Sequence, residues 1–365
     1  MKKALLSLFA LLILTVFTAC GSSEGTTAPD NNSDAETQTE DTNKETKSET
    51  TEGGTLTIAW LPNESGADIK AARDAIGKEI EEATGMKVEH QTTTDYIIAI
   101  EAIANGNADL AFLGAQGYVE AHTKNSNVLP LVVTSGASGT IDDAVYYSWL
   151  AVKNGNEDEY KNGDEFSIDN IAGKRFSFVS NSSTSGFKVP ANGIVSHFTQ
   201  MDEHKDLTDE DLLEGGDFFS EVLYGGSHQG SAVNLITDKA DVAAFCDACV
   251  QNYIELASGE ENRAGSVYKV KEGADEPFNT FPGEEFVLIS VTPVLNAPFV
   301  MNTDNIGEDL QKKLLELFTS DAMANNEEVF VPKDSGENGL FYKTEAERFL
   351  EVEDAWFNPI RELSK

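Results

Sequence analysis

The most informative stretch of the chain reads Lys174-Arg-Phe-Ser-Phe-Val179 and then Ser180-Asn-Ser-Ser-Thr-Ser-Gly-Phe-Lys-Val-Pro190. The first segment has the composition of a buried strand, and a helix is expected from Gly186 or Pro190 to Phe198. The polar loop therefore opens a helix at the end of a strand. Hydroxyls and free backbone N–H groups at a helix N-terminus form a ready anion site. A solvated serine-rich loop with an ordinary helix cap is the alternative interpretation.

The same rhythm of strand and helix recurs along the rest of the chain. Short apolar runs bounded by turn residues predict strands, and apolar residues at helical spacing predict the helices between them. The expected strands are 56–61, 86–90, 108–113, 129–133, 174–179, 220–224, 241–245 and 285–290. The expected helices are 67–84, 96–104, 190–198, 229–237, 310–318 and 344–356, with a turn at Thr292-Pro293.

Alternating strands and helices predict an α/β protein with parallel layers. Two polar turns, 105–109 and 237–241, are similar in sequence. Each follows a helix, ends in Ala-Asp and precedes a buried strand, so we expect them at equivalent places in two lobes. Ligands of such sheets lie beyond the carboxyl ends of the strands, in the cleft between lobes. We assign 54–147 to the first lobe, 148–285 to the second, and 286–365 to a return to the first lobe.

Three further segments place polar side chains beside these elements. His228 lies in Tyr224-Gly-Gly-Ser-His-Gln-Gly230, between a strand and a helix. Asp95-Tyr96 begins a helix, and Tyr146-Tyr-Ser148 comes just before an apolar run. An imidazole or a phenol can donate a hydrogen bond to an anion. Taken alone, each of these residues is more often part of the core or its rim.

Taken in order, the segments resemble a known family, and the quoted motifs are Tyr146-Tyr-Ser148, Ile171-Ala-Gly-Lys-Arg175, Ser183-Thr-Ser-Gly186 with Pro190, Tyr224-Gly-Gly-Ser-His228 and Ala240-Asp-Val-Ala-Ala244. The family is that of the phosphate/phosphite/phosphonate-binding proteins of ABC importers, the PhnD-like group. The resemblance covers most of 55–300 and is strongest from 145 to 250. It implies the type II periplasmic-binding-protein fold, with two α/β lobes around a central ligand cleft, and a binding protein rather than an enzyme, without cofactor or metal.

The resemblance also implies roles for individual residues in the second lobe. Ser183, Thr184 and Ser185 would bind phosphonate oxygens at the helix N-terminus. His228 would donate a further hydrogen bond to the same anion.

The remaining implied site residues come from the first lobe, the crossover and the end of a strand. Tyr96 would contribute from the first lobe. One of Tyr146 and Tyr147 would contribute from the crossover, and Tyr147 is preferred because it precedes Ser148. Asp247 falls near an acidic position that meets the ligand amine in aminophosphonate binders.

Two cysteines bracket that acid in Phe245-Cys-Asp-Ala-Cys249. In an exported protein this spacing is compatible with a disulfide, a redox pair or two buried thiols. Zinc would need further ligands, and none stands at a useful spacing. A structural pair, reduced or oxidised, is the preferred interpretation.

The net charge argues against a nucleic-acid-binding protein. The 365 residues carry 26 Lys+Arg against 63 Asp+Glu, a formal net charge of −37. A protein that binds nucleic acid needs a basic face to neutralise phosphates, and this chain has few cations for one. With 40% hydrophobic residues the chain has enough apolar side chains for a core.

The N-terminal segment reads as an export signal followed by a tether. Lys2 and Lys3 precede an apolar run that is too short to span a bilayer, which is typical of a signal peptide over 1–19. The run ends at Phe17-Thr-Ala-Cys-Gly21, which resembles the bacterial lipobox, so Cys20 is the expected lipidated residue. The acidic, Thr-rich segment 20–53 contains no Leu, Ile, Val, Met or aromatic residue after Cys20 and is expected to be a disordered tether.

These observations favour a lipid-anchored, extracytoplasmic receptor that captures a small phosphorus oxyanion for an ABC permease and its ATPase. Two alternatives remain. A ligand-sensing lipoprotein would use the same closing cleft to signal to a partner. A Ser/His hydrolase would use Ser183 and His228, although the nucleophile pattern Gly-x-Ser-x-Gly does not occur in the chain.

Overall fold

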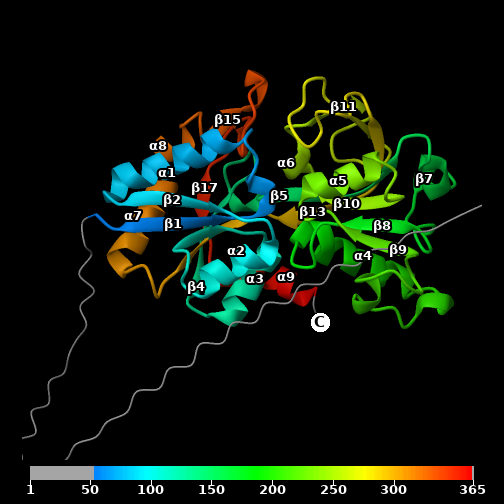
Figure 1. Cartoon of the computed structure of the whole chain (residues 1–365), viewed down its shortest axis with the longest axis horizontal. Helices are drawn as coiled ribbons and strands as arrows, with labels where there is room; N and C mark the ends of the chain where they lie inside the picture. Colours follow the sequence, from blue (N-terminus) through cyan, green and yellow to red (C-terminus); the bar gives the residue numbers. More distant parts are fainter. Residues whose placement is uncertain (1–52, 364–365) are drawn as a thin grey trace, which may run out of the picture. The chain divides into compact units, whose positions relative to one another are not determined.

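The computed structural model describes residues 53–363, which form two α/β lobes, each built on its own mixed sheet (Figure 1). The expected signal peptide, the lipobox with Cys20 and all but the last residue of the tether lie outside the described residues.

The first lobe is built on a six-stranded sheet with the order β17-β4-β14-β3-β1-β2. β1 pairs in parallel with β2 and β3, whereas β14 and β17 run antiparallel to their neighbours. The strands are β1 (Thr55–Trp60), β2 (Lys87–Thr92), β3 (Leu110–Phe112), β4 (Val128–Thr134), β14 (Pro298–Asn302) and β17 (Phe349–Glu351). The expected parallel layer is thus mixed, because β14, on which the chain returns from the second lobe, and β17 near the end of the chain both pair antiparallel with their neighbours.

Helices cover both faces of this first sheet, and two apolar clusters lie beneath them. On one face lie α1 (Lys70–Thr84), α7 (Glu308–Phe318) and α8 (Asp321–Ala324). On the other lie α2 (Tyr96–Ala104), α3 (Ala115–Lys124) and α9 (Asn358–Glu362). Gly85 ends α1 in the left-handed conformation, and the Asp95 side chain caps α2 by accepting the Ile97 N–H.

The second lobe is built on a seven-stranded sheet with the order β11-β12-β13-β5-β10-β8-β9. Its strands are β5 (Val145–Lys153), β8 (Arg175–Phe178), β9 (Glu221–Tyr224), β10 (Val242–Cys246), β11 (Ile254–Ser258), β12 (Val267–Val270) and β13 (Glu285–Leu295). α4 (Val189–Phe198) packs on one face, and α5 (His228–Ile236) and α6 (Asp247–Val250) pack on the other. Two small pairs complete the fold, β6 (Lys161–Asn162) with β7 (Glu165–Phe166) and β15 (Phe330–Pro332) with β16 (Phe341–Lys343).

The chain crosses between the lobes twice, and the two crossings lie side by side. β5 leaves the first lobe and β13 returns to it, and these strands are antiparallel with Val145 opposite Leu295. Because β5 and β13 both belong to the sheet of the second lobe, the chain crosses before Val145 and after Leu295. The sequence had suggested boundaries at 147/148 and 285/286. The expected turn at Thr292-Pro293 is wrong, because β13 continues through it. Proline has no N–H to donate to a neighbouring strand. Pro293 is tolerated in β13 because β12 pairs only with the first residues of this strand, so no strand of the described residues lies beside Pro293 on that side.

The two polar turns chosen from the sequence do occupy equivalent places. In the first lobe the Asp109 carboxylate accepts the Thr57 N–H of β1 at 2.8 Å. In the second lobe the Asp241 carboxylate accepts the Arg175 N–H of β8 at 2.9 Å. Each aspartate thereby joins the strand that it precedes to the neighbouring parallel strand, and so aligns the strand ends on which each lobe builds its loops.

The helix expected over 344–356 is wrong. Burial alternates there, with Phe349 buried and Leu350 half-buried, and the segment forms β17, which pairs with β4. Period-two burial is the pattern of a strand packed on one face. Only a short 3-10 turn at Asp354–Phe357 and α9 follow.

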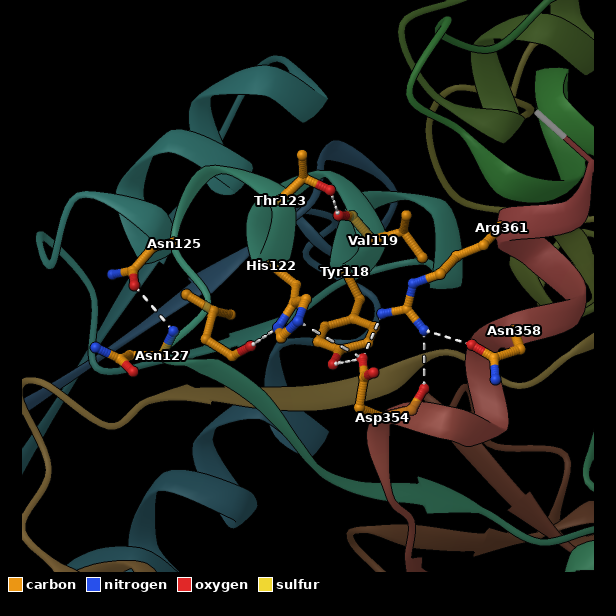
Figure 2. Close-up of polar contacts among 10 residues, drawn as sticks. Tyr118, Val119, His122, Thr123, Asn125, Asn127, Asp354, Asn358 and Arg361 are labelled. Carbon is orange, nitrogen blue, oxygen red and sulfur yellow. Dashed lines mark hydrogen bonds and ion pairs between the residues drawn. The ribbon is translucent and has the colours of Figure 1, made fainter. Parts of the chain in front are cut away.

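This last segment is held against α3 by a polar cluster, which Figure 2 shows. The Tyr118 phenol donates to Asp354 Oδ1 at 2.5 Å, and the Arg361 guanidinium pairs with the same carboxylate. The Arg361 guanidinium also lies 5.9 Å from the centre of the Tyr118 ring. The end of the chain thus completes the first lobe, as the sequence had placed it, although through a strand and short turns.

The two equivalent aspartates give a stability prediction. Asp109→Ala and Asp241→Ala each leave a partly buried backbone N–H without its carboxylate acceptor, so each should lower the free energy of unfolding by about 1–2 kcal/mol. Urea unfolding measures this, with the exposed Glu327→Ala as a control that should change little. Loss in only one of the two variants would contradict their equivalence.

Candidate functional site

A cavity of about 120 Å³ lies between the two lobes, where the ends of strands from both sheets meet. The first lobe contributes the turn after β1 and the starts of α2 and α3, and the second contributes the loop after β8 and the start of α5. The polar residues of its lining include Asn63, Glu64, Asp68, Tyr96, Tyr146, Ser183, Thr184, Ser185, His228, Gln229, Asn252 and Tyr253.

Hydrogen bonds between the lobes enclose this cavity. Asn63 Oδ1 in the first lobe accepts the His228 N–H at 3.0 Å. Thr184 Oγ1 in the second lobe accepts the Gln116 N–H at 2.9 Å. A Cβ on Gly114 would lie 2.8 Å from that hydroxyl oxygen, so this glycine permits the close approach. The described residues thus adopt a closed arrangement.

The loop Ser183–Ser185 forms a cradle at the start of a π-helical turn that leads into α4. Ser183 Oγ caps the turn by accepting the Gly186 N–H at 3.1 Å. A Cβ at Gly186 would lie 2.3 Å from the Val179 side chain, so only glycine fits this turn against the end of β8. The fold thereby holds three consecutive hydroxyl side chains, all buried, at one helix N-terminus.

The hydroxyl of Ser185 is buried and has no hydrogen-bond partner among the described residues. A hydrogen bond from β5 holds the Ser185 backbone, because Ser148 Oγ donates to the Ser185 carbonyl at 2.6 Å. A buried polar atom without a partner is costly, and such atoms usually have a role. The arrangement leaves this hydroxyl available to a bound ligand.

The imidazole of His228 is held in one tautomer. Its Nδ1 accepts the Cys246 N–H at 2.9 Å, so in the neutral ring the proton is on Nε2. That nitrogen lies 3.4 Å from Ser183 Oγ, at the cavity. Burial lowers the pKa of His228 from 6.5 to about 3, so the ring is a neutral N–H donor at ordinary pH.

This tautomer argues against the hydrolase interpretation. A catalytic histidine takes up the proton of the nucleophile on Nε2, while a carboxylate orients its Nδ1–H. In this structure Nε2 of His228 already carries the proton, and a backbone N–H occupies Nδ1. Ser183 and His228 are close, but their contact offers a donor to an anion rather than a base to a nucleophile.

Tyr96 is oriented by a neighbour that the sequence analysis missed. Asn63 Nδ2 donates to the Tyr96 phenol oxygen at 2.6 Å, so the phenol's own proton is free to point elsewhere. Burial raises the pKa of Tyr96 and keeps it a neutral donor. Asn63 lies just beyond β1, and the rule that ligands bind at the carboxyl ends of strands would have found it.

The structure corrects the choice between the two crossover tyrosines. Tyr146, which lines the cavity, lies on the same face of β5 as Ser148. Tyr147 packs with the cluster on the opposite face. Neighbouring residues of a strand point to opposite faces, and residues two positions apart point to the same face. A residue on the same face as Ser148 is therefore Tyr146 and not Tyr147.

Asp247, the expected partner of a ligand amine, does not line this cavity either. Its Oδ1 accepts the Tyr147 N–H at 2.9 Å and so ties the start of α6 to β5. Burial raises the pKa of Asp247 to about 6. Its contacts are those of a structural carboxyl.

Cys246 and Cys249 form a disulfide beside the cavity. Their sulfurs and a ring nitrogen of His228 lie within 4.8 Å of one another, a grouping that the sequence spacing did not reveal. Because both sulfurs are in the disulfide and Nδ1 accepts a backbone N–H, this oxidised form offers no thiolate to a metal.

Known proteins resemble this chain in sequence and in fold. A family model described as "ABC transporter, phosphonate, periplasmic substrate-binding protein" matches residues 58–357. The chain belongs to this family. Its members are extracytoplasmic substrate-binding proteins of transporters rather than enzymes. Among residues 53–363, no helix is both long and apolar enough to cross a membrane.

One relative of known name is the phosphate-import protein PhnD of Mycolicibacterium smegmatis. It is 30% identical over 196 residues, which cover 54% of this chain and 56% of that protein, so the match spans little more than half of its length.

Two solved structures show the same fold at low identity. One is a binding protein component of an ABC phosphonate transporter from Pseudomonas aeruginosa, with a TM-score of 0.60, 19% identity and 85% of each chain covered. The other is PhnD1 from Prochlorococcus marinus in complex with methylphosphonate, with a TM-score of 0.58 and 17% identity, covering 85% of this chain and 97% of that one. The type II periplasmic-binding-protein fold expected from the sequence is confirmed.

The lowered pKa of His228 predicts a pH effect on stability. The neutral ring contributes stability that is present above pH 6.5, its unfolded value, and is lost as the pH falls toward about 3, because the unfolded chain then binds the proton. Between about pH 6.5 and about pH 5, the wild type should therefore lose about 2 kcal/mol relative to His228→Gln. Urea unfolding at both pH values measures the difference, and parallel losses in the two proteins would contradict the assignment.

Proposed function

We propose that this chain captures a small phosphorus oxyanion, which is a phosphonate, phosphite or phosphate, in the interlobe cavity and delivers it to an ABC permease and its ATPase. The observation that carries the proposal is a convergence of oriented neutral donors. Ser185 Oγ has no hydrogen-bond partner among the described residues, His228 is held with its proton on Nε2, and the Tyr96 phenol oxygen already accepts from Asn63, so its O–H is a donor.

The charge of the lining supports this proposal. Among the described residues, no lysine and no arginine lines the cavity. Hydrogen bonds from oriented dipoles can stabilise an anion in a buried site without a full positive charge. A chain with a net charge of −37 cannot attract an anion through its overall field, so a local pocket of donors is the remaining physical means.

The size of the cavity points to a small ligand. About 120 Å³ is well below the ~300–1,000 Å³ typical of sites for drug-sized molecules. The mycobacterial relative is named a phosphate-import protein, and the structure from Prochlorococcus holds methylphosphonate. Both ligands are small tetrahedral oxyanions, which agrees with a cradle of three consecutive hydroxyls.

Individual residues receive roles under this proposal. Ser183, Thr184 and Ser185 donate to oxygens of the anion at the helix N-terminus. His228 donates from Nε2, and Tyr96 donates from the first lobe. In place of Tyr147, its neighbour Tyr146 supplies the second phenol, while Asp247 holds β5 and α6 together.

Paired variants test the site. Tyr146→Phe and Ser185→Ala each remove a donor to a charged ligand, so each should weaken binding about 10-fold or more in calorimetry. The matched controls are Tyr147→Phe, whose ring packs on the other face of β5, and Ser196→Ala, an exposed serine of α4. Both controls should bind within about twofold of the wild type, on the scale of ordinary surface changes.

The ligands for this experiment are phosphate, phosphite, methylphosphonate and 2-aminoethylphosphonate, screened first by thermal shift. A ligand that binds only the folded protein raises its apparent stability. Failure of all four to bind the wild type would overturn the proposed function, and equal losses in the variants and their controls would overturn the site.

We further propose that Cys20 is lipidated after removal of 1–19 and anchors the chain to the outer face of the cell membrane. The proposal rests on the signal-like run and the lipobox that ends it. The expressed wild type should fractionate with membranes and carry lipid on Cys20 in mass spectrometry. Cys20→Ser should lose the lipid, and an unmodified wild-type cysteine would contradict the anchor.

A further inference from the structure

Glu64 is a buried carboxyl in the cavity that none of the roles above uses. It lies in the 3-10 turn Pro62–Glu64, directly after β1, and its residue is only 6% exposed. Its Oε2 is buried and has no hydrogen-bond partner among the described residues. Arg73 donates to the backbone carbonyls of Glu64 and Gly66, and among the described residues no ion pair with the Glu64 carboxylate forms.

The Glu64 carboxyl lines the same cavity as the proposed donors. Burial raises the pKa of both Tyr96 and Tyr146, and the proximity of Glu64 raises both further. These are the two phenols assigned to the oxyanion. Asp68, the other acid of the lining, is engaged elsewhere, since its carboxylate accepts from the Tyr253 phenol and the Asn252 amide.

An ionised carboxylate and an oxyanion cannot share such a site without a proton between them. Like charges repel strongly in a buried site of low dielectric constant, and no lysine or arginine of the described residues lines this cavity. A carboxyl that shares one proton with a ligand oxygen turns the repulsion into a short, charge-assisted hydrogen bond.

We propose that the site binds its oxyanion together with one proton, which is held between Glu64 and a ligand oxygen. This inference rests on the proposed function and makes Glu64 a specificity-determining residue for oxyanions in a protonated state. The proton balance is simple. At neutral pH the proton is already on Glu64 or on the oxygen of a monoanionic ligand, and at high pH, where both are ionised, it is taken up from solvent.

The titration behaviour of the site agrees with this geometry. Burial raises the pKa of Glu64 from 4.5 to about 8, so the free protein holds the proton at neutral pH. Burial lowers the pKa of His228, which lines the same cavity, to about 3, and it raises the pKa values of Tyr96, Tyr146 and Tyr253 above the ordinary phenol value. Asp247, which lies outside the lining, has its pKa raised by burial to about 6, so none of these groups titrates near pH 8. Burial lowers the pKa of Arg73 below its ordinary value, and the Asp68 carboxylate accepts from Tyr253 and Asn252.

Calorimetric titration of the purified full-length protein with methylphosphonate tests the proposal. Between about pH 8 and about pH 9.5, wild-type affinity should fall about 10-fold, because a proton must be taken up against an increasing cost. In two buffers of different ionisation enthalpy at the higher pH, binding should take up about one proton per ligand. Glu64→Gln, which keeps a neutral polar group, should show neither the loss nor the uptake.

Asp68→Asn is the matched control, because it removes the other carboxyl of the lining. Whatever its affinity, this variant should keep the wild-type loss and the proton uptake. The proton count on the wild type alone also tests the proposal if Glu64→Gln fails to fold.

Three results would overturn the inference. Wild-type binding that is independent of pH and takes up no proton would do so, as would the same loss in Glu64→Gln. A rise in affinity with pH for 2-aminoethylphosphonate would mean that ionised Glu64 pairs with the ligand ammonium instead. All three leave the proposed function standing, whereas that function fails separately if no phosphorus oxyanion binds at about pH 8.

Discussion

Polar side chains between the two lobes are held by hydrogen bonds in fixed directions, and under the proposed function these directions present positive ends to a buried anion. The lining includes no lysine or arginine among the described residues, so each polar neighbour has to be held in the correct direction. The bond from the Cys246 N–H to His228 Nδ1 is the clearest example, because one backbone contact selects the tautomer that presents an N–H to the cavity. Asn63 acts in the same way on Tyr96.

The fold supplies these directions by bringing strand ends together. Each lobe joins its parallel strands through an aspartate, Asp109 or Asp241, that accepts a backbone N–H of the adjacent strand. The two crossings run side by side as β5 and β13, so the loops beyond both sheets face one cavity. The donors therefore come from segments far apart in sequence, although each segment is short and locally simple.

Prediction from the sequence succeeded where a local pattern was sufficient. The strand, polar loop and helix of 174–198 follow from the hydrophobic pattern, and most core strands were placed to within a few residues. It failed where pairing with a distant strand decides the structure. The segment around Phe349 is apolar enough for a helix, but β4 offers it a sheet edge, and Pro293 is tolerated because one side of β13 is open.

The sequence by itself determined the α/β class, the two-lobed plan, the hydroxyl cradle and the family, because these depend on local periodicity and on short motifs. Only the tertiary structure decided that Tyr146 rather than Tyr147 lines the cavity and that His228 presents an N–H. It also decided that Glu64 Oε2 is buried with no hydrogen-bond partner among the described residues. The physical reason is that a side chain's direction, tautomer and protonation depend on what surrounds it in space. Those surroundings come from strands and lobes that the chain joins only when it folds.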